Sequence, residues 1–426
     1  MDLKKSLWVA CTQGNLELLQ HITSIPQFFY MYNRNEHGES PFWITCHYGH
    51  LDLAKHLYYN SFADIKLSND DNITPLQEAC RKGHLSIVTW LYPILDHHHK
   101  MCLHHAIYGN HIHIVQWLLE HHHGQSPFDY EMNTPLHIAC KMNSCVEILC
   151  NYNPSLNAAN VDGYTPLLIA CQFGHSYLCE YLYTQGASIH NRSAFHETSL
   201  LLACEYGSLY LVQWLHSHGV DMNQPDIYGQ LPISIAASLG HTHLLPWLSQ
   251  YSSIHHQTNL GQTPFLLACR NGHLSTAQML QRLSTEPLYE HRDFLECSPL
   301  YYAVETQHLP LVYWLSSFGI SYDETLFDHV TESMLEHLFL LGACHYKNKL
   351  CTTPFMKYYT HTDIWRHLRQ RLYRQYTQRV LLLKKNMYEF DDLMRILPWC
   401  SNVSYLIGGF VGILRDDPWE RLLTVK

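Results

Sequence analysis

Histidine is the side chain in this sequence with the most capacity for metal or proton chemistry, with 34 residues. Ten of them fall in one stretch of 27 residues: His97, His98, His99, His104, His105, His111, His113, His121, His122 and His123. Imidazole binds zinc, copper or nickel, so this stretch could hold a metal ion. Against a specific site, adjacent histidines point in different directions and no Cys-x-x-Cys pair accompanies them. We expect no metal or cofactor, and metal binding by the cluster at 97–123 stays an open alternative.

The 15 cysteines suggest a disulfide framework or a thiol catalyst. Seven of them share one position of an internal repeat: Cys11, Cys46, Cys80, Cys140, Cys171, Cys204 and Cys269. Neighbouring copies should lie about 10 Å apart, the packing distance of helices, which is too far for a disulfide. We therefore expect small buried thiols in a reducing compartment.

Signatures of catalysis are missing from the sequence. It contains no nucleophile elbow, phosphate-binding glycine loop, kinase motif set or His-Glu-x-x-His. With so many cysteines and histidines, a Cys–His pair close in space is expected by chance and would not indicate a thiol enzyme. The sequence therefore predicts a protein that is not an enzyme.

Composition limits the partners. A hydrophobic content of 46% allows a substantial core, whereas a formal charge of -10 gives no general attraction to nucleic acid. The apolar stretch Leu7–Cys11 is too short for a targeting signal, and the run Tyr405–Leu414 is about half a membrane span. We expect no membrane span, a cytoplasmic location and a monomer.

An internal repeat organises most of the chain. Thr-Pro-apolar recurs at Thr74, Thr134, Thr165 and Thr263, and about five residues later comes a small pair, usually Ala-Cys. The second residue of that pair marks the register at Cys11, Cys46, Cys80, Ile107, Cys140, Cys171, Cys204, Ala237, Cys269 and Val304. Successive marks lie near 33 residues apart, except for a gap of 27 before Ile107.

This pattern resembles the ankyrin-repeat family. The segment Thr134-Pro135-Leu136-His137-Ile138-Ala139 matches the ankyrin signature letter for letter. The resemblance implies an all-α solenoid of helix-turn-helix units, with about ten repeats over residues 4–324. It also implies that the protein binds another protein.

The residues agree with that expectation. Thr165 is a good N-cap before Pro166, the small pair Ala170-Cys171 lets helices approach, and Gly174 ends the first helix. The histidine that follows this glycine can hydrogen-bond loop backbone. Ten residues after the mark, bulky side chains should stack along the array, as at Trp90, Trp117, Trp214, Trp247 and Trp314.

Toward the C-terminus the pattern fades. We expect degenerate ankyrin-like repeats over 325–360 and a basic, then apolar, helical segment over 361–426 that caps the solenoid. An alternative is that the basic helix touches a membrane surface or a partner groove. The segment Phe390–Leu414 faintly resembles the boxes through which some ankyrin proteins join ubiquitin ligases.

The partner surface is expected on the inner face, which in ankyrin proteins is made of turn tips and first helices. Aromatic side chains precede the helix-ending glycine at Tyr48, Tyr108, Phe173 and Tyr206, with charged or aromatic neighbours at Arg81, Lys82, Lys141, Glu205, Tyr228 and Arg270. Tyr and Arg dominate interface energies, so these residues are candidates for partner contacts.

Two functions remain open. The first is a protein-protein interaction scaffold that binds its partner on the concave face. The second is an adaptor or secreted effector whose C-terminal segment recruits other machinery, such as a ubiquitin ligase; in that case the cytosol could be that of a host cell.

Overall fold

The computed structural model describes residues 3–25, 34–60, 63–95, 101–121, 128–152 and 154–318. The described chain is helical, with only an isolated bridge between Arg192 and Thr198, which confirms the all-α prediction. It forms two compact units, unit 1 (Met1–Ile235) and unit 2 (Ala236–Lys426). The expected degenerate repeats at 325–360 and the cap at 361–426 lie outside the described residues and stay predictions.

The helices alternate as first and second members of antiparallel pairs. The first helices are α1 Leu3–Gln13, α3 Pro41–Tyr48, α5 Pro75–Lys82, α7 Cys102–Tyr108, α9 Pro135–Met142, α11 Pro166–Gln172, α13 Ser199–Tyr206, α15 Pro232–Ser238, α17 Pro264–Arg270 and α19 Pro299–Glu305. The second helices are α2 Leu16–Thr23, α4 Leu51–Tyr59, α6 Leu85–Leu91, α8 Ile112–His121, α10 Val146–Cys150, α12 Ser176–Thr184, α14 Leu209–Ser217, α16 Leu245–Leu248, α18 Leu274–Leu283 and α20 Leu309–Ser316. Short 3₁₀ helices add η2 Tyr92–Ile94, η3 Thr242–Leu244 and η4 Leu288–Glu290.

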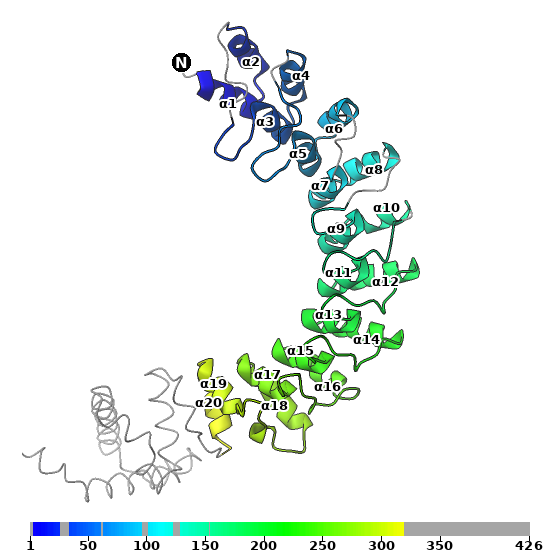
Figure 1. Cartoon of the computed structure of the whole chain (residues 1–426), viewed down its shortest axis with the longest axis vertical. Coiled ribbons are helices and arrows are strands. Elements are labelled where there is room, and N and C mark those ends of the chain that lie inside the picture. The colour runs from blue at the N-terminus through cyan, green and yellow to red at the C-terminus, as the bar shows by residue number, and fades with distance from the viewer. Residues whose placement is uncertain are drawn as a thin grey trace, which may run out of the picture. The chain divides into compact units, whose positions relative to one another are not determined.

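Within unit 1 the first helices lie on one side of the stack and the second helices on the other (Figure 1). Consecutive first helices from α1 to α13 pack more extensively than consecutive second helices do. The small register residues explain this, since Ala170, Cys171 and Ala203 are fully buried between first helices. In unit 2, α17 packs against α18 and α19, and α19 packs against α20.

Each first helix starts as its sequence predicts. The hydroxyl of Thr165 accepts a hydrogen bond from the backbone N–H of Leu168, and Pro166 is the first helical residue. The same cap occurs at Ser40, Thr74, Thr134, Thr198, Thr263 and Ser298. Two helices depart from this pattern: Met101 precedes α7 in a left-handed conformation without a side-chain cap, and α15 is preceded by Leu231, whose side chain has no acceptor. The α7 helix still packs between α5 and α9, so the short fourth unit keeps its place in the stack.

The turns that precede the first helices share one mechanism. The Oδ1 atom of Asp226 accepts hydrogen bonds from the backbone N–H groups of Tyr228 and Gln230, at 2.9 and 2.7 Å. Turn tips are joined by main-chain bonds, as between the N–H of Ile227 and the carbonyl of Phe195 at 3.1 Å. Equivalent bonds join Asp70 to His37, Val161 to Glu131, Ala194 to Asp162 and Phe294 to Leu260.

The Gly-His step links neighbouring units. The Nε2 atom of His84 donates to the carbonyl of His47 at 2.9 Å, and its ring lies over Gly49 of the preceding unit. His50 and His111 bond the carbonyls of Thr12 and Arg81 in the same way. The predicted bonding of this histidine to loop backbone is therefore confirmed at these positions. The prediction is wrong at His175, because its Nε2 atom is buried without a hydrogen-bond partner. In the preceding unit the first helix is followed by Asn143-Ser144 instead of Gly-His.

Gly49→Ala tests this link. Gly49 has φ +82°, and an added Cβ would lie 2.5 Å from Nδ1 of His84. Left-handed strain costs roughly 1–2 kcal/mol, and displacing the imidazole should bring the total loss of unfolding free energy to about 3 kcal/mol. Urea unfolding measures it. Gly186→Ala is the control, because Gly186 has φ +100° with open space around it. Equal losses in the two variants would contradict a packing role for His84.

Three of the tryptophans ten residues after the mark pack between units, as predicted. Each of three indoles meets a tyrosine of the preceding unit edge to face, with ring centroids 5.4–5.7 Å apart: Trp90 on Tyr58, Trp117 on Tyr92 and Trp214 on Tyr183. These pairs add aromatic contact to second helices that otherwise pack loosely.

Candidate partner-binding surface

Four aromatic side chains are exposed near the ends of first helices in unit 1: Tyr48, Phe173 and Tyr206 lie two residues after the register mark, and Tyr108 lies one residue after it. We call Tyr48, Tyr108, Phe173 and Tyr206 the aromatic row. Tyr48, Tyr108 and Tyr206 end α3, α7 and α13, and Phe173 follows the last residue of α11. Their exposed fractions are 49%, 40%, 37% and 55%. Such exposure of large apolar rings on one side of a stack favours a contact surface over core packing.

Neighbouring groups fix three of these rings. Tyr48 stacks on His50 with centroids 6.1 Å apart, and Phe173 stacks on His175 at 6.2 Å. The ring of Tyr206 lies against the backbone of Gly174, where an added Cβ would overlap it. Side chains already held in place lose less conformational entropy when a partner binds.

Arg81 is only partly available to a partner. Its Nε and Nη2 atoms donate to the two carboxylate oxygens of Glu78, each at 2.8 Å, and its side chain is 40% exposed. His47 of α3 contacts the same carboxylate at 2.8 Å through Nδ1. The Glu78 side chain is fully buried. Burial alone would raise the pKa of Glu78, but the hydrogen bonds and charges of His47 and Arg81 lower it to about 2.

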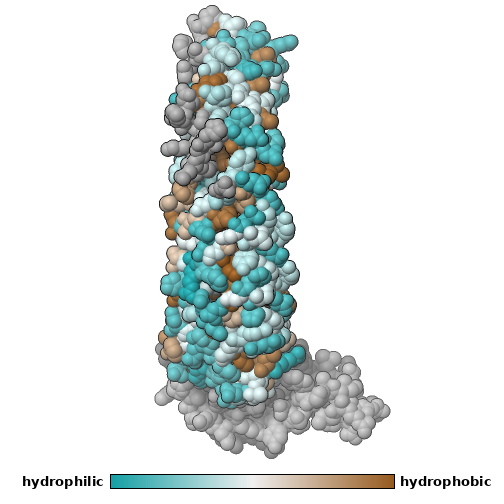
Figure 2. Space-filling model, turned by 90° about the vertical axis from the view of Figure 1, so that its right-hand side faces the viewer, coloured by the Kyte–Doolittle hydropathy of each residue, from teal (hydrophilic) through white to brown (hydrophobic). Residues whose placement is uncertain are grey.

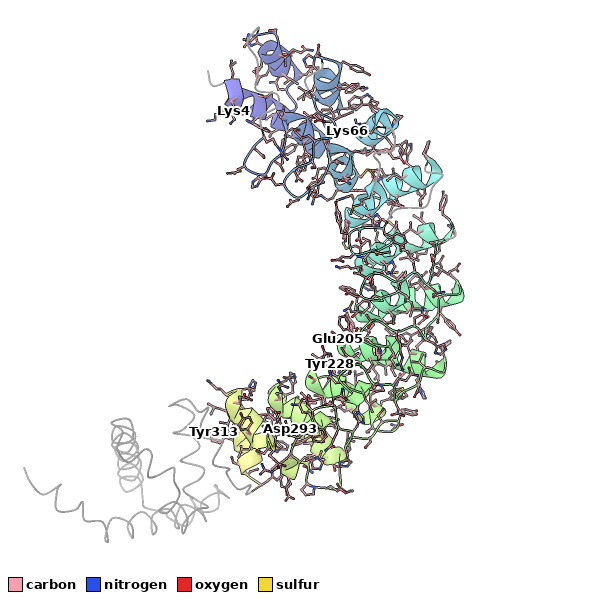
Figure 3. All side chains as sticks on the ribbon, viewed as in Figure 1. Lys4, Lys66, Glu205, Tyr228, Asp293 and Tyr313 are labelled. Atoms are coloured by element: carbon pink, nitrogen blue, oxygen red, sulfur yellow. The ribbon has the colours of Figure 1, made fainter. Side chains whose placement is uncertain are left out.

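The other predicted residues of unit 1 are exposed on helix ends and turns. Lys82 ends α5, Lys141 lies in the last turn of α9, and Glu205 lies beside Tyr206 in α13. Tyr228 is 60% exposed on the Asp226–Gln230 turn, and Figure 3 shows Glu205 and Tyr228 on the first-helix side. Burial, with Glu197 nearby, raises the pKa of Glu205.

Arg270 belongs to unit 2 and has an intramolecular contact. It ends α17, and its guanidinium carbon lies 5.7 Å from the centre of the Tyr302 ring. That distance allows a cation–π interaction. The hydroxyl of Tyr302 in turn accepts from Gln262 and donates to Asp293.

Sequence reasoning missed two residues in this region, one exposed and one buried. Met142 ends α9 at the position of the aromatic row and is 41% exposed. Glu78 occupies a column that is mostly apolar, as at Ile138 and Ile169. That departure in the repeat alignment was the available signal for a buried ionic contact.

Comparison with known proteins agrees with the geometry. A family model of ankyrin repeats, spanning three copies, matches residues 7–101, 103–193, 176–258, 200–289 and 234–325. The chain belongs to the ankyrin-repeat family. No curated protein matches it significantly. Ankyrin repeats are generally protein-protein interaction modules, and the family typically consists of non-enzymatic scaffolds.

The repeated cysteines of the ankyrin array are free and fully buried, as predicted. Burial raises the pKa of the Cys11 thiol to about 12, and it raises those of Cys46, Cys204 and Cys269 further. A thiol with so high a pKa is a poor nucleophile at neutral pH. These residues therefore contribute packing and not thiol chemistry.

Several histidines of the cluster at 97–123 hold ankyrin units together. His104 aligns with His137 of the signature, and each Nε2 donates to the carbonyl just before the next first-helix cap: Asn133 at 3.0 Å and Tyr164 at 2.9 Å. His111 and His113 reach the carbonyls of Arg81 and Gly83. Within 101–121, the described part of the cluster, no three metal-ligating side chains converge. His97, His98, His99, His122 and His123 lie outside the described residues.

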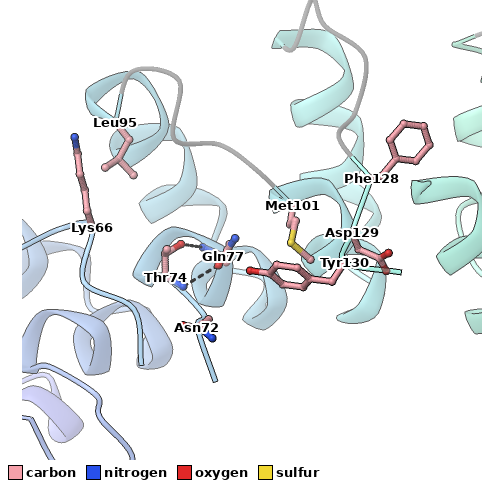
Figure 4. A pocket seen from close by; sticks show the side chains of 9 residues that line it. All are labelled: Lys66, Asn72, Thr74, Gln77, Leu95, Met101, Phe128, Asp129 and Tyr130. Atoms are coloured by element: carbon pink, nitrogen blue, oxygen red, sulfur yellow. Dashed lines mark hydrogen bonds between the residues drawn. The ribbon is translucent and has the colours of Figure 1, made fainter. Parts of the chain in front are cut away.

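A cavity of about 440 Å³ lies beside the short fourth repeat (Figure 4). It is lined by Lys66, Asn72, Thr74, Gln77, Leu95, Met101, Phe128, Asp129 and Tyr130. Thr74 and Gln77 bond each other's backbone in a capping box, and the Asp129 carboxylate is bonded within its own turn. Thr74, Gln77 and Asp129 therefore have structural roles in this lining.

Among the described helices, none combines the length and the apolar character needed to cross a membrane.

Proposed function

We propose that this chain is an interaction scaffold that binds a partner protein on the first-helix side of unit 1. The aromatic row is the observation that carries the proposal. Exposed, pre-positioned Tyr and Phe side chains are the anchors that dominate interface energies, and Lys82 and Lys141 provide a charged rim. The repeat period places one such anchor position in each unit, which suits an extended partner segment.

The second-helix side provides a matched control surface. Figure 2 shows hydrophilic residues mixed with scattered hydrophobic ones on that side. It carries four exposed tyrosines, Tyr59, Tyr152, Tyr177 and Tyr210, with exposed fractions of 69%, 47%, 66% and 59%. Mutating them removes a comparable aromatic area without touching the aromatic row.

Affinity capture from lysate with the full chain, followed by Kd measurement on the captured partner, tests the proposal. Replacing all four residues of the aromatic row with Ala should weaken binding by at least about 100-fold, because each anchor contributes about 1 kcal/mol or more. The control variant with Tyr59, Tyr152, Tyr177 and Tyr210 replaced by Ala should bind like the wild type. Circular dichroism checks that both variants fold. Equal weakening in both variants would overturn the proposal.

A chain ending at Tyr359 separates the adaptor alternative from the scaffold. The segment 361–426 lies outside the described residues, so recruitment of a ubiquitin ligase or other machinery stays a prediction. A partner that survives the aromatic-row variant but is lost on truncation would move the binding function to that segment.

A further inference from the structure

The loop after α18 in unit 2, residues 284–298, contains a short helix of its own. The marks Cys269 and Val304 lie 35 residues apart, against 32 for the preceding interval. This loop contains η4, Leu288–Glu290, with Glu286 before it and His291 directly after it. The loop after α16 in the preceding repeat carries His255. Loops of two consecutive repeats thus bring two imidazoles and a carboxylate to one place.

The three side chains converge. One ligand atom of each, an imidazole nitrogen of His255 and His291 and a carboxylate oxygen of Glu286, lies within 4.8 Å of the other two. The two imidazole rings have centroids 5.6 Å apart and are inclined by 55°. Such a pair of rings does not stack, so both can turn a nitrogen toward a common point.

His291 is poised to bind a cation. Its Nδ1 atom is buried without a hydrogen-bond partner. Leaving a buried polar nitrogen unsatisfied is unfavourable, and a bound ion would remove that cost. Burial and the nearby His255 lower the pKa of His291. The carboxylates of Glu286 and Glu290 supply negative charge beside it.

The loop after α18 is held in place independently of any ion. The Gln281 side chain donates to the carbonyl of Glu286 at 2.9 Å and accepts from the N–H of Leu288 at 3.0 Å. Leu288 is fully buried, and Tyr289 stacks on Phe318 with centroids 4.5 Å apart. The backbone on both sides of η4 is therefore fixed, which positions Glu286 and His291 before a metal arrives.

We propose that His255, Glu286 and His291 form a binding site for a divalent transition-metal ion such as Zn²⁺. Two imidazoles and one carboxylate are a set that zinc accepts, with metal–ligand bonds of about 2.0–2.2 Å. Tetrahedral ligands at that distance lie about 3.4 Å apart, so ligand atoms that now lie within 4.8 Å of one another close in by up to about 1.4 Å. His255 and Glu286 are exposed and free to rotate that far. The ion links the loop after α18 to the loop after α16 in the preceding repeat. A fourth coordination position remains for water or a partner side chain.

Zinc titration of the full chain against a chromophoric chelator at pH 7 tests the site. The chain has many other histidines and cysteines, so the comparison between variants is the measurement. His255→Gln/His291→Gln should bind one equivalent less than the wild type. The control His37→Gln/His190→Gln removes two exposed histidines of unit 1 and should lose none. Equal stoichiometry and affinity in the wild type and the site variant, or the same loss in the control, would overturn the proposal.

A second measurement guards against misfolding. The single change Glu286→Gln alters an exposed side chain and should weaken binding at this site by tenfold or more. Zinc should also slow amide hydrogen exchange in residues 284–292 of the wild type and leave it unchanged in Glu286→Gln. Protection of the same size in both proteins would place the ion elsewhere.

Discussion

Glu78→Ala is expected to lower the free energy of unfolding of unit 1 by about 3 kcal/mol at pH 7, the lower end of the range for breaking a buried ion pair. The substitution removes a fully buried carboxylate and leaves the Nδ1 atom of His47 and the Arg81 guanidinium without their acceptor. Because the Arg81 side chain is 40% exposed, its charge can reach water, which keeps the loss at that lower end. Urea unfolding monitored by circular dichroism measures the change.

The effect of Glu78→Ala should depend on pH in one direction. The pKa of Glu78 falls from 4.5 to about 2 on folding, so its contribution is complete above pH 4.5. As the pH drops from 4.5 toward 2, that contribution is lost and the stabilities of wild type and variant converge. Glu36→Ala, at a side chain 88% exposed, should change stability by less than about 0.5 kcal/mol. A constant difference between wild type and Glu78→Ala down to pH 3 would contradict a charged buried carboxylate.

Phe265→Ala should destabilise unit 2 by about 4 kcal/mol, since truncating a buried aromatic ring removes its transfer energy and leaves a cavity. Phe265 is fully buried in α17, and its ring centroid lies 6.2 Å from that of Trp314 in α20. In a repeat stack each unit contacts only its neighbours, so the loss should be local.

Native-state hydrogen exchange distinguishes a local loss of stability from a global one. Amides of α17 and α19 should lose protection in Phe265→Ala, while those of α3 and α5 in unit 1 should stay as in the wild type. Phe265→Leu keeps most of the volume and should cost about 1.5 kcal/mol or less. Uniform loss of protection along the chain would contradict nearest-neighbour stability.

The fold was predictable because its signals are local and repeated. A cap such as Thr165, a first-turn Pro166 and the small Ala170-Cys171 pair each act within a few residues, and the register repeats them. Where the local signal is absent, as at Met101, the helix still forms, because α5 and α9 pack on both sides of it. Tertiary packing replaces the missing cap there.

The site was less predictable because its contacts join residues far apart in sequence. Tyr48, Phe173 and Tyr206 share one repeat position, Tyr108 lies one residue earlier in its repeat, and the structure exposes all four. The ion pair of Arg81 does not follow from repeat position, because it depends on the buried carboxylate of Glu78. That carboxylate also contacts His47, 31 residues away. The contact of His255 with His291 does not follow from repeat position either, because it depends on the path of the loop after α18. Repeat periodicity carries no information about that loop.

The bonds between turn tips have an evolutionary consequence. They join main-chain atoms only, from the N–H of one tip to the carbonyl of the tip before it. The tip geometry rests on these bonds and on the side-chain acceptor at the start of each turn, such as Asp226, so the exposed tip residues Phe195, Tyr228 and Leu260 can be exchanged at little cost to stability. Mutations can thus accumulate at these tips until one of them confers a new specificity. An array built in this way can change its partner faster than it changes its fold.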